Sequence, residues 1–126
     1  MNNKTTIKCD FTIEAIDVDP YLIVKQLDID CSMTKIKKYE KTSLIIFSTE
    51  YIEGLDIYDA LNIIINCFYS KTDILRELKM VYGLEYAINF IIKIKDNFVP
   101  GMTIEKDTIA FLDKIGGVMD FDMYIV

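Results

Sequence analysis

The sequence has no histidine and no tryptophan among its 126 residues. Histidine is the commonest general base of enzymes and the commonest metal ligand in proteins, so the usual routes to acid–base and transition-metal chemistry are missing. The phosphate-binding and hydrolase motifs GxGxxG, GxxxxGK[ST], GxSxG and HExxH are absent as well. We therefore expect a protein that is not an enzyme, with no catalytic residues, no metal site and no cofactor.

Long apolar runs and an excess of positive charge are also absent. No apolar run approaches the roughly 18–20 residues of a membrane-spanning helix, and the first residues lack the apolar core of a signal peptide. The net charge is −6. This charge argues against a nucleic-acid ligand, because phosphate contacts need clustered Lys and Arg. We expect no membrane association, a cytoplasmic location and, if the protein has a partner, a basic one.

Cysteine is scarce: Cys9, Cys31 and Cys67 are widely spaced, and no CxxC occurs. Free cysteine usually behaves as a small apolar residue. We expect three reduced and mostly buried thiols, with a metal or disulfide role as the alternative.

What the sequence does contain is 52% hydrophobic and 27% charged residues, which is typical of one globular domain over 1–126. The clearest strand pattern is at 6–15, where five apolar residues alternate with Lys8, Asp10, Thr12 and Glu14. Successive strand side chains point to opposite faces, so this segment has a core face and a wet face.

The closing segment 103–126 predicts a helix, a two-glycine turn and a strand. Thr103 is placed as the N-cap, and Ile109, Leu112 and Ile115 form the expected buried stripe. In the strand 118–126, four residues are expected to face the core, and the alternate positions carry the acidic side. The core set is Met119, Phe121, Met123 and Ile125, and the acidic side holds Val118, Asp120, Asp122, Tyr124 and Val126.

Between these ends the pattern predicts helices from Asp19-Pro20, from Asp56 and from 70–72 to Gly83, and strands at 44–49 and 85–95. The lysine-rich segment 33–41 is either an edge strand protected by its lysines or a loop. The predicted fold is α+β: a two-layer sandwich with a mixed or antiparallel sheet and helices on one face. If 33–41 is a strand, the order is a ferredoxin-like βαββαβ with an added αβ unit.

Two stretches resemble a known family. The opening DFTIEAIDVDPYLIVKQLDI and the closing IEKDTIAFLDKIGGVMDFDMYIV are similar to the two ends of the DUF4279 family of bacterial proteins. The chain has no Trp in 44–49 and has Glu14-Ala15 where a glycine is frequent, so it looks like an outlying member. The resemblance implies a fold and, because the family's function is unknown, almost no activity. Small divergent bacterial proteins of this kind include immunity partners of secreted toxins, which is an analogy only.

The candidate site is the outer face of the first and last strands. Its residues are Asp10, Glu14, Asp120, Asp122 and Tyr124. Three interpretations stay open: an ion-paired and solvated face, since Lys8, Lys93 and Lys95 share it; a partner-binding face; and a metal or carboxylate acid/base site.

The functional hypothesis is a protein-binding domain that contacts a basic partner through these residues, in its sharpest form an immunity protein that neutralises a basic toxin. A carboxylate-based, metal-dependent enzyme and a homo-oligomer built on the open sheet face are the alternatives.

Overall fold

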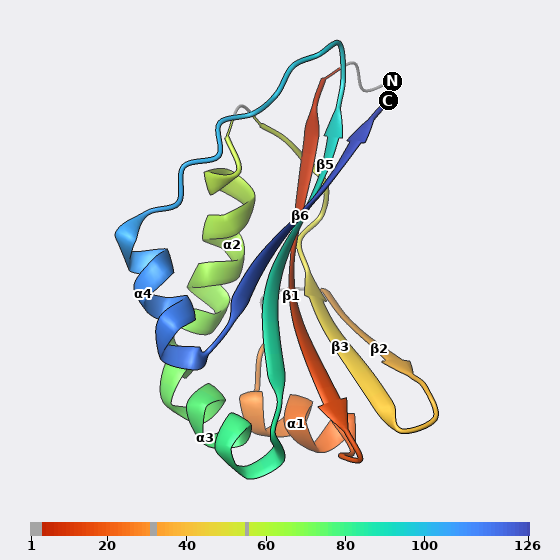
Figure 1. Cartoon of the computed structure of the whole chain (residues 1–126), viewed down its shortest axis with the longest axis vertical. Helices are drawn as coiled ribbons and strands as arrows, with labels where there is room; N and C mark the ends of the chain where they lie inside the picture. The colour runs from red at the N-terminus through yellow and green to blue at the C-terminus, as the bar shows by residue number, and fades with distance from the viewer. Residues whose placement is uncertain (1–3, 31–32, 55) are drawn as a thin grey trace.

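The structure is a computed structural model that describes residues 4–30, 33–54 and 56–126. A twisted sheet runs the length of the molecule, and the helices lie against one of its sides (Figure 1). The elements in chain order are β1 (Thr6–Ile16), α1 (Pro20–Leu27), β2 (Met33–Lys38), β3 (Thr42–Ser48), β4 (Ile52–Glu53), α2 (Tyr58–Phe68), the 3-10 turn η1 (Tyr69–Lys71), α3 (Thr72–Tyr82), β5 (Glu85–Ile94), α4 (Lys106–Ile115) and β6 (Val118–Ile125).

The sheet is mixed and open. Its strand order is β2-β3-β1-β5-β6, and the short β4 pairs with the start of β1. All pairings are antiparallel except β5 with β6, which is parallel. The prediction of an α+β protein with a mixed sheet is confirmed, and its assignment to the ferredoxin-like class stays a prediction.

Strand β1 is central because its alternating sequence supplies a complete apolar face. Ile7, Cys9, Phe11 and Ile13 are fully buried under the helices. The Phe11 ring stacks on Phe68 of α2, with 4.1 Å between ring centroids. The first predicted strand is therefore confirmed, and it extends by one residue to Ile16.

The helix boundaries follow local chemistry. The Asp19 carboxylate accepts a hydrogen bond from the Tyr21 N–H and Pro20 opens α1, as predicted. The Asp56 carboxylate accepts one from the Tyr58 N–H at the start of α2. Helix α3 ends at Gly83, whose φ of 66° is the left-handed conformation that glycine adopts without strain.

The lysine-rich segment is an edge strand. Residues 33–38 form β2, which pairs with β3 alone among the strands described. Its burial pattern is exposed at every position except the half-buried Ile36. Lysines on such an edge hinder unwanted pairing, because an incoming strand must desolvate or approach them.

The prediction for α4 is wrong in two respects. The helix begins at Lys106 after Glu105, rather than after Thr103, because the preceding chain is tied to the start of α2: the Ile57 N–H donates to the Gly101 carbonyl at 2.9 Å. Its buried residues include Phe111 and exclude Ile109, which is 56% exposed. The stripe formed by 108, 111, 112 and 115 fits the helical period.

The burial prediction for β6 is also wrong, although its faces are assigned correctly. The register places Phe121 beside Phe90 and Met123 beside Ile92, so both lie on the helix side of the sheet. They are nevertheless 37% and 46% exposed, and Ile125 is 83% exposed. Because β6 is the last strand of the sheet, it lacks a neighbour on one side and most of the cover that the central strands receive.

Candidate binding face

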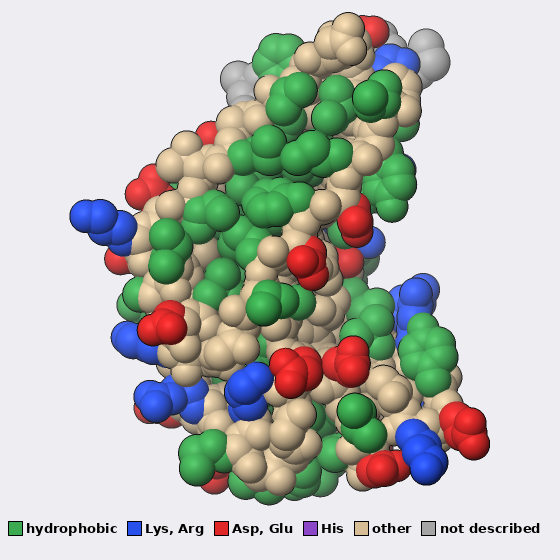
Figure 2. All heavy atoms as spheres, in the orientation of Figure 1, with side chains coloured by type: hydrophobic (Ala, Val, Ile, Leu, Met, Phe, Trp, Pro, Cys, Tyr) green, Lys and Arg blue, Asp and Glu red, His purple; other side chains and the backbone are tan. Residues whose placement is uncertain are grey.

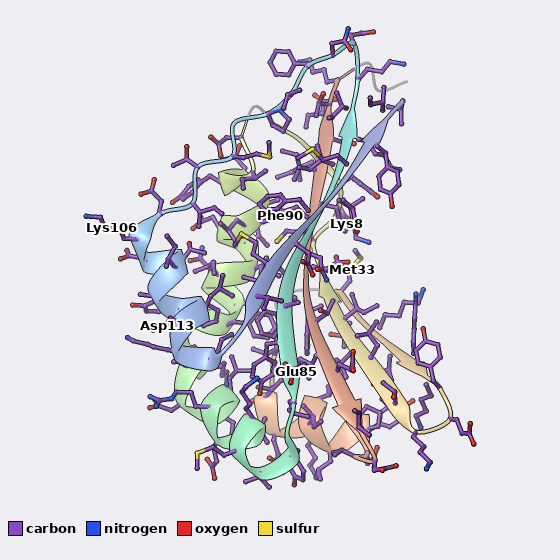
Figure 3. The ribbon with its side chains drawn as sticks, in the orientation of Figure 1. Lys8, Met33, Glu85, Phe90, Lys106 and Asp113 are labelled. Atoms are coloured by element: carbon purple, nitrogen blue, oxygen red, sulfur yellow. The ribbon has the colours of Figure 1, made fainter. Side chains whose placement is uncertain are left out.

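The sheet side opposite the helices is called the open face. On β1 it carries Lys8, Asp10, Thr12 and Glu14, which alternate with the buried positions. Figure 3 shows the two sides: Lys8 and Met33 project from one, and Phe90 points to the other. In Figure 2 the right-hand side of the molecule is hollowed above the β2–β3 hairpin. Within the part of the chain described here, no helix covers this side.

The strand register lines up polar side chains across the middle of the open face. Asp10 pairs with Ser48 on β3 and with Asn89 on β5, and Asn89 pairs with Asp120 on β6. We call Ser48, Asp10, Asn89 and Asp120 the Asp10 row. Neighbouring strands lie about 4.8 Å apart, so Asp10 and Asp120 are separated by about 10 Å. Two carboxylates on different strands thus face the same space with an amide between them.

Asp10 is the unusual member of this row. The residue is only 8% exposed, and its Oδ1 is buried without a hydrogen-bond partner among the described residues. The same oxygen lies 3.8 Å from Lys8 Nζ, close enough for an ion pair and too far for a hydrogen bond. Burying a charged group costs free energy unless hydrogen bonds compensate. Asp10 is therefore a carboxylate that lacks a close donor.

The polar groups beside Asp10 are already engaged with each other. Asn89 Nδ2 donates to Thr12 Oγ1 at 3.2 Å, and the Thr12 hydroxyl donates to the Ala87 carbonyl at 3.4 Å. These bonds run across β1 and β5 and hold both side chains in place. Neither side chain donates a hydrogen bond to Asp10, so its Oδ1 remains an acceptor without a donor at the centre of the open face.

Lysines gather at one end of the open face around an aromatic ring. Lys93 Nζ lies 4.3 Å from the centre of the Tyr51 ring, and Lys8 Nζ lies 5.8 Å from it. A cation over an aromatic face is attracted by the ring quadrupole. Lys8 therefore lies between Asp10 and Tyr51, which explains why it approaches the carboxylate without closing on it.

The predicted site residues share the open face but form no single cluster. Asp10 and Asp120 lie in one row, and Asp122 follows on β6 beside Ile91. Tyr124 is 54% exposed and pairs with Lys93 at the lysine-rich end. Glu14 lies four residues from Asp10, about 13 Å along the strand, where it pairs with Glu85.

Three contributors to this face were absent from the predicted site. Ser48 and Asn89 complete the Asp10 row, and Tyr51 binds the two lysines. The alternation of β5 identifies Asn89 as an outward-facing residue. Only the register between β1 and β5 shows that it lies beside Asp10. Tyr51 stands in the short connection before β4, where no periodicity marks a face.

Two buried titratable groups with raised pKa values lie on the helix side of the sheet. Burial, helped by the Asp10 charge, raises the pKa of the Cys9 thiol well above its usual range. Burial raises the pKa of Tyr86 as well, and its hydroxyl donates to the Leu75 carbonyl at 2.7 Å. Both groups are neutral at pH 7 and have no access to the open face.

The cysteine prediction is only partly correct. Cys9 is a free, buried thiol, as expected. Cys67 is disulfide-bonded, so the expectation of reduced thiols is wrong there. Cys31 lies outside the described residues.

The described ranges hold neither a metal-binding cluster nor a membrane-spanning helix. No three Cys, Asp or Glu side chains of these ranges gather closely enough to hold a metal ion. None of their helices has the length and apolarity to cross a membrane. A groove of about 860 Å³ lies on the helical side between α2 and the start of α4, remote from the Asp10 row.

The fold and this face define an α+β protein with a mixed sheet that the described helices cover on one side and leave open on the other. Comparison with protein families matches residues 5–126 to DUF4279, a domain of unknown function. The chain belongs to this family. No curated protein and no solved structure matches this chain.

Proposed function

We propose that this protein is a protein-binding domain that receives a basic partner on its open face. One observation carries the proposal: the Asp10 carboxylate is buried in the centre of an uncovered sheet and its Oδ1 lacks a hydrogen-bond donor. The Oδ1 atom is shielded from solvent in the free protein, so a lysine or arginine of a partner would supply that donor once the side chains around it move aside on binding. Charge-assisted hydrogen bonds of this kind are the strong ones.

The surrounding face supports the same kind of partner. Asp120 and Asp122 are exposed on β6 and extend the negative charge from the centre to the edge. Tyr124 stands beside them, and tyrosine is enriched among residues that dominate interface energies. Glu14 lies farther along β1 and would contact only a partner that spans the length of the strand. The sharpest version of the proposal is an immunity protein that neutralises a basic toxin, by analogy with other small bacterial proteins.

The test compares three immobilised proteins in an extract of the native host. They are the wild type, an open-face variant with Asp10→Asn, Asp120→Asn and Asp122→Asn, and a control with Asp73→Asn, Asp107→Asn and Asp113→Asn on the helices. The control has the same net charge as the open-face variant. We expect one basic protein to be retained by the wild type and the control and lost from the open-face variant.

Kinetics on the captured protein then decide the mechanism. Complementary charge mainly accelerates association and is screened by salt, so the association rate should fall between low and high salt while dissociation changes less. Tyr124→Ala should weaken binding by about 2 kcal/mol or more if it is an anchor. Equal capture by all three proteins, or a salt-independent association rate, contradicts the proposal. Growth arrest by the captured protein that the wild type and the control relieve, and the open-face variant does not, would support the immunity version.

A further inference from the structure

The sheet ends in two strands of opposite charge. β2 and β6 each pair with one neighbour in the described structure, so each presents an unpaired row of backbone N–H and C=O groups. On the open face, β2 carries Lys35 and Lys37, and β6 carries Asp120 and Asp122. All four residues are exposed, and none takes part in an ion pair within the described chain.

We propose that β6 of one copy pairs with β2 of a second copy, so that the sheet continues from molecule to molecule. The direction of the strands permits this directly. β2 is antiparallel to β3, β3 to β1 and β1 to β5, and β5 is parallel to β6. β2 therefore runs antiparallel to β6. Moving a copy sideways along the sheet, without turning it over, brings its β2 antiparallel to the first copy's β6.

One register of this strand pair gives favourable side-chain contacts on both faces of the sheet. If Lys35 lies opposite Asp122 and Lys37 opposite Asp120, opposite charges meet twice on the open face. The residues between them, Ile36 and Phe121, then lie opposite each other on the helix side. Ile36 is half-buried at the core margin and Phe121 is 37% exposed, so pairing would cover the apolar side chains that each edge leaves uncovered. Opposite charges and aromatic–β-branched pairs are the cross-strand contacts that stabilise antiparallel strands.

Pairing between identical edges is disfavoured by the same residues. Two antiparallel β6 strands centred on Phe121 would place Asp120 opposite Asp122 twice. Two β2 strands centred on Ile36 would place Lys35 opposite Lys37. Like charges directly opposite destabilise a strand pair. The charges thus disfavour these two symmetric pairings and favour the head-to-tail contact, which forms a ring when the rotation closes and a filament when it does not.

This contact shares Asp120 and Asp122 with the partner contact proposed for the open face, but it does not use Asp10 at the centre of that face. It uses the strand edges, keeps the helices of successive copies on one side, and joins their open faces. One strand pair makes a small interface, below about 1,200 Å², so association is expected to be weak and to depend on protein concentration.

The test is sedimentation velocity on the full chain over a concentration series, at about 20 mM and about 500 mM salt, because exposed charges are screened by ions. The wild type should grow in mass with concentration at low salt, and less so at high salt. The variant Lys35→Asp/Lys37→Asp and the variant Asp120→Lys/Asp122→Lys should each remain monomeric alone. Their equimolar mixture should assemble again, because each edge then meets an edge of opposite charge.

Lys25→Asp/Lys106→Asp is the matched control, since it changes the net charge as the β2 variant does, on the helices. It should assemble like the wild type. A wild type that stays monomeric, an edge variant that assembles alone, or a mixture that stays monomeric overturns the proposal. Circular dichroism checks that each variant folds. If a charge-reversal variant does not fold, the corresponding Lys→Gln or Asp→Asn variant replaces it. Loss of assembly in the replacement supports the proposal, and assembly like that of the wild type contradicts it.

Discussion

Replacing Asp10 by valine should stabilise the fold, since the native residue places a carboxylate where the sheet has no donor for it. An unsatisfied buried polar group costs about 1–3 kcal/mol. Valine also suits a strand better than aspartate, within a scale that spans about 1 kcal/mol. The lost ion pair with Lys8 offsets about 1 kcal/mol, since its two charged atoms are 3.8 Å apart and make no hydrogen bond. The expected net gain in the free energy of unfolding is about 1–3 kcal/mol, against about 5–15 kcal/mol for a typical domain.

Urea unfolding followed by far-ultraviolet circular dichroism measures this gain, since the chain has no tryptophan for a fluorescence probe. The matched control is Asp120→Val, which makes the same change in the same row at an exposed edge. Its effect should stay within about 0.5 kcal/mol, as for most surface substitutions. A loss of stability in Asp10→Val would refute the reasoning, because it would mean that the ionised carboxylate is well solvated or bonded in the free protein.

Three further predictions follow from burial and charge. Phe11→Ala should destabilise by about 3–5 kcal/mol, and Phe121→Ala by markedly less, because only Phe11 is fully enclosed; urea midpoints of the two variants decide this. The raised pKa values of Cys9 and Tyr86 favour their neutral forms in the folded state. This contribution to stability is complete below the unfolded-state pKa values, about 8.5 and 10, and is lost as the pH rises above them. Urea melts between pH 7 and 11 should therefore show stability that falls with pH. In Cys9→Val the fall should begin at a higher pH, because only Tyr86 remains to cause it. Calorimetry with Mg²⁺, Ca²⁺ or Mn²⁺ should show no dissociation constant below about 10⁻⁴ M, and micromolar binding abolished by Asp120→Asn would reopen the metal-dependent alternative.

The sequence predicts those parts of the fold in which local periodicity and burial agree. Over residues 6–15 of β1 the alternation of apolar and polar residues is complete, and the five apolar positions of that segment are buried. In β5 the inward positions Ile88, Phe90 and Ile92 are likewise fully buried. In both strands the two neighbours and the helices impose the environment that the pattern requires.

The closing strand shows where this reasoning fails. β6 has the same alternation, yet Met123 and Ile125 remain largely exposed, because alternation assigns a face without saying whether anything covers it. The position of a strand in the sheet decides whether other elements cover its apolar face. That position depends on pairings between residues far apart in the sequence. The Asp10 row has the same origin: periodicity places Asp10 and Asp120 on outer faces, whereas only the pairings of β1 with β5 and of β5 with β6 place them in one row.

The two proposed contacts share two carboxylates, but each also has residues of its own, which makes the contacts separable by experiment. A basic partner on the open face and the β2 strand of a second copy both use Asp120 and Asp122, so a partner that engages these carboxylates should compete with assembly. Asp10 belongs to the partner contact alone, since it lies two strands inside the β6 edge. Asp10→Asn should therefore abolish partner capture and leave assembly intact, whereas Lys35→Asp/Lys37→Asp should abolish assembly and leave capture intact. If one of these variants removed both activities, the partner and the second copy would depend on one shared site.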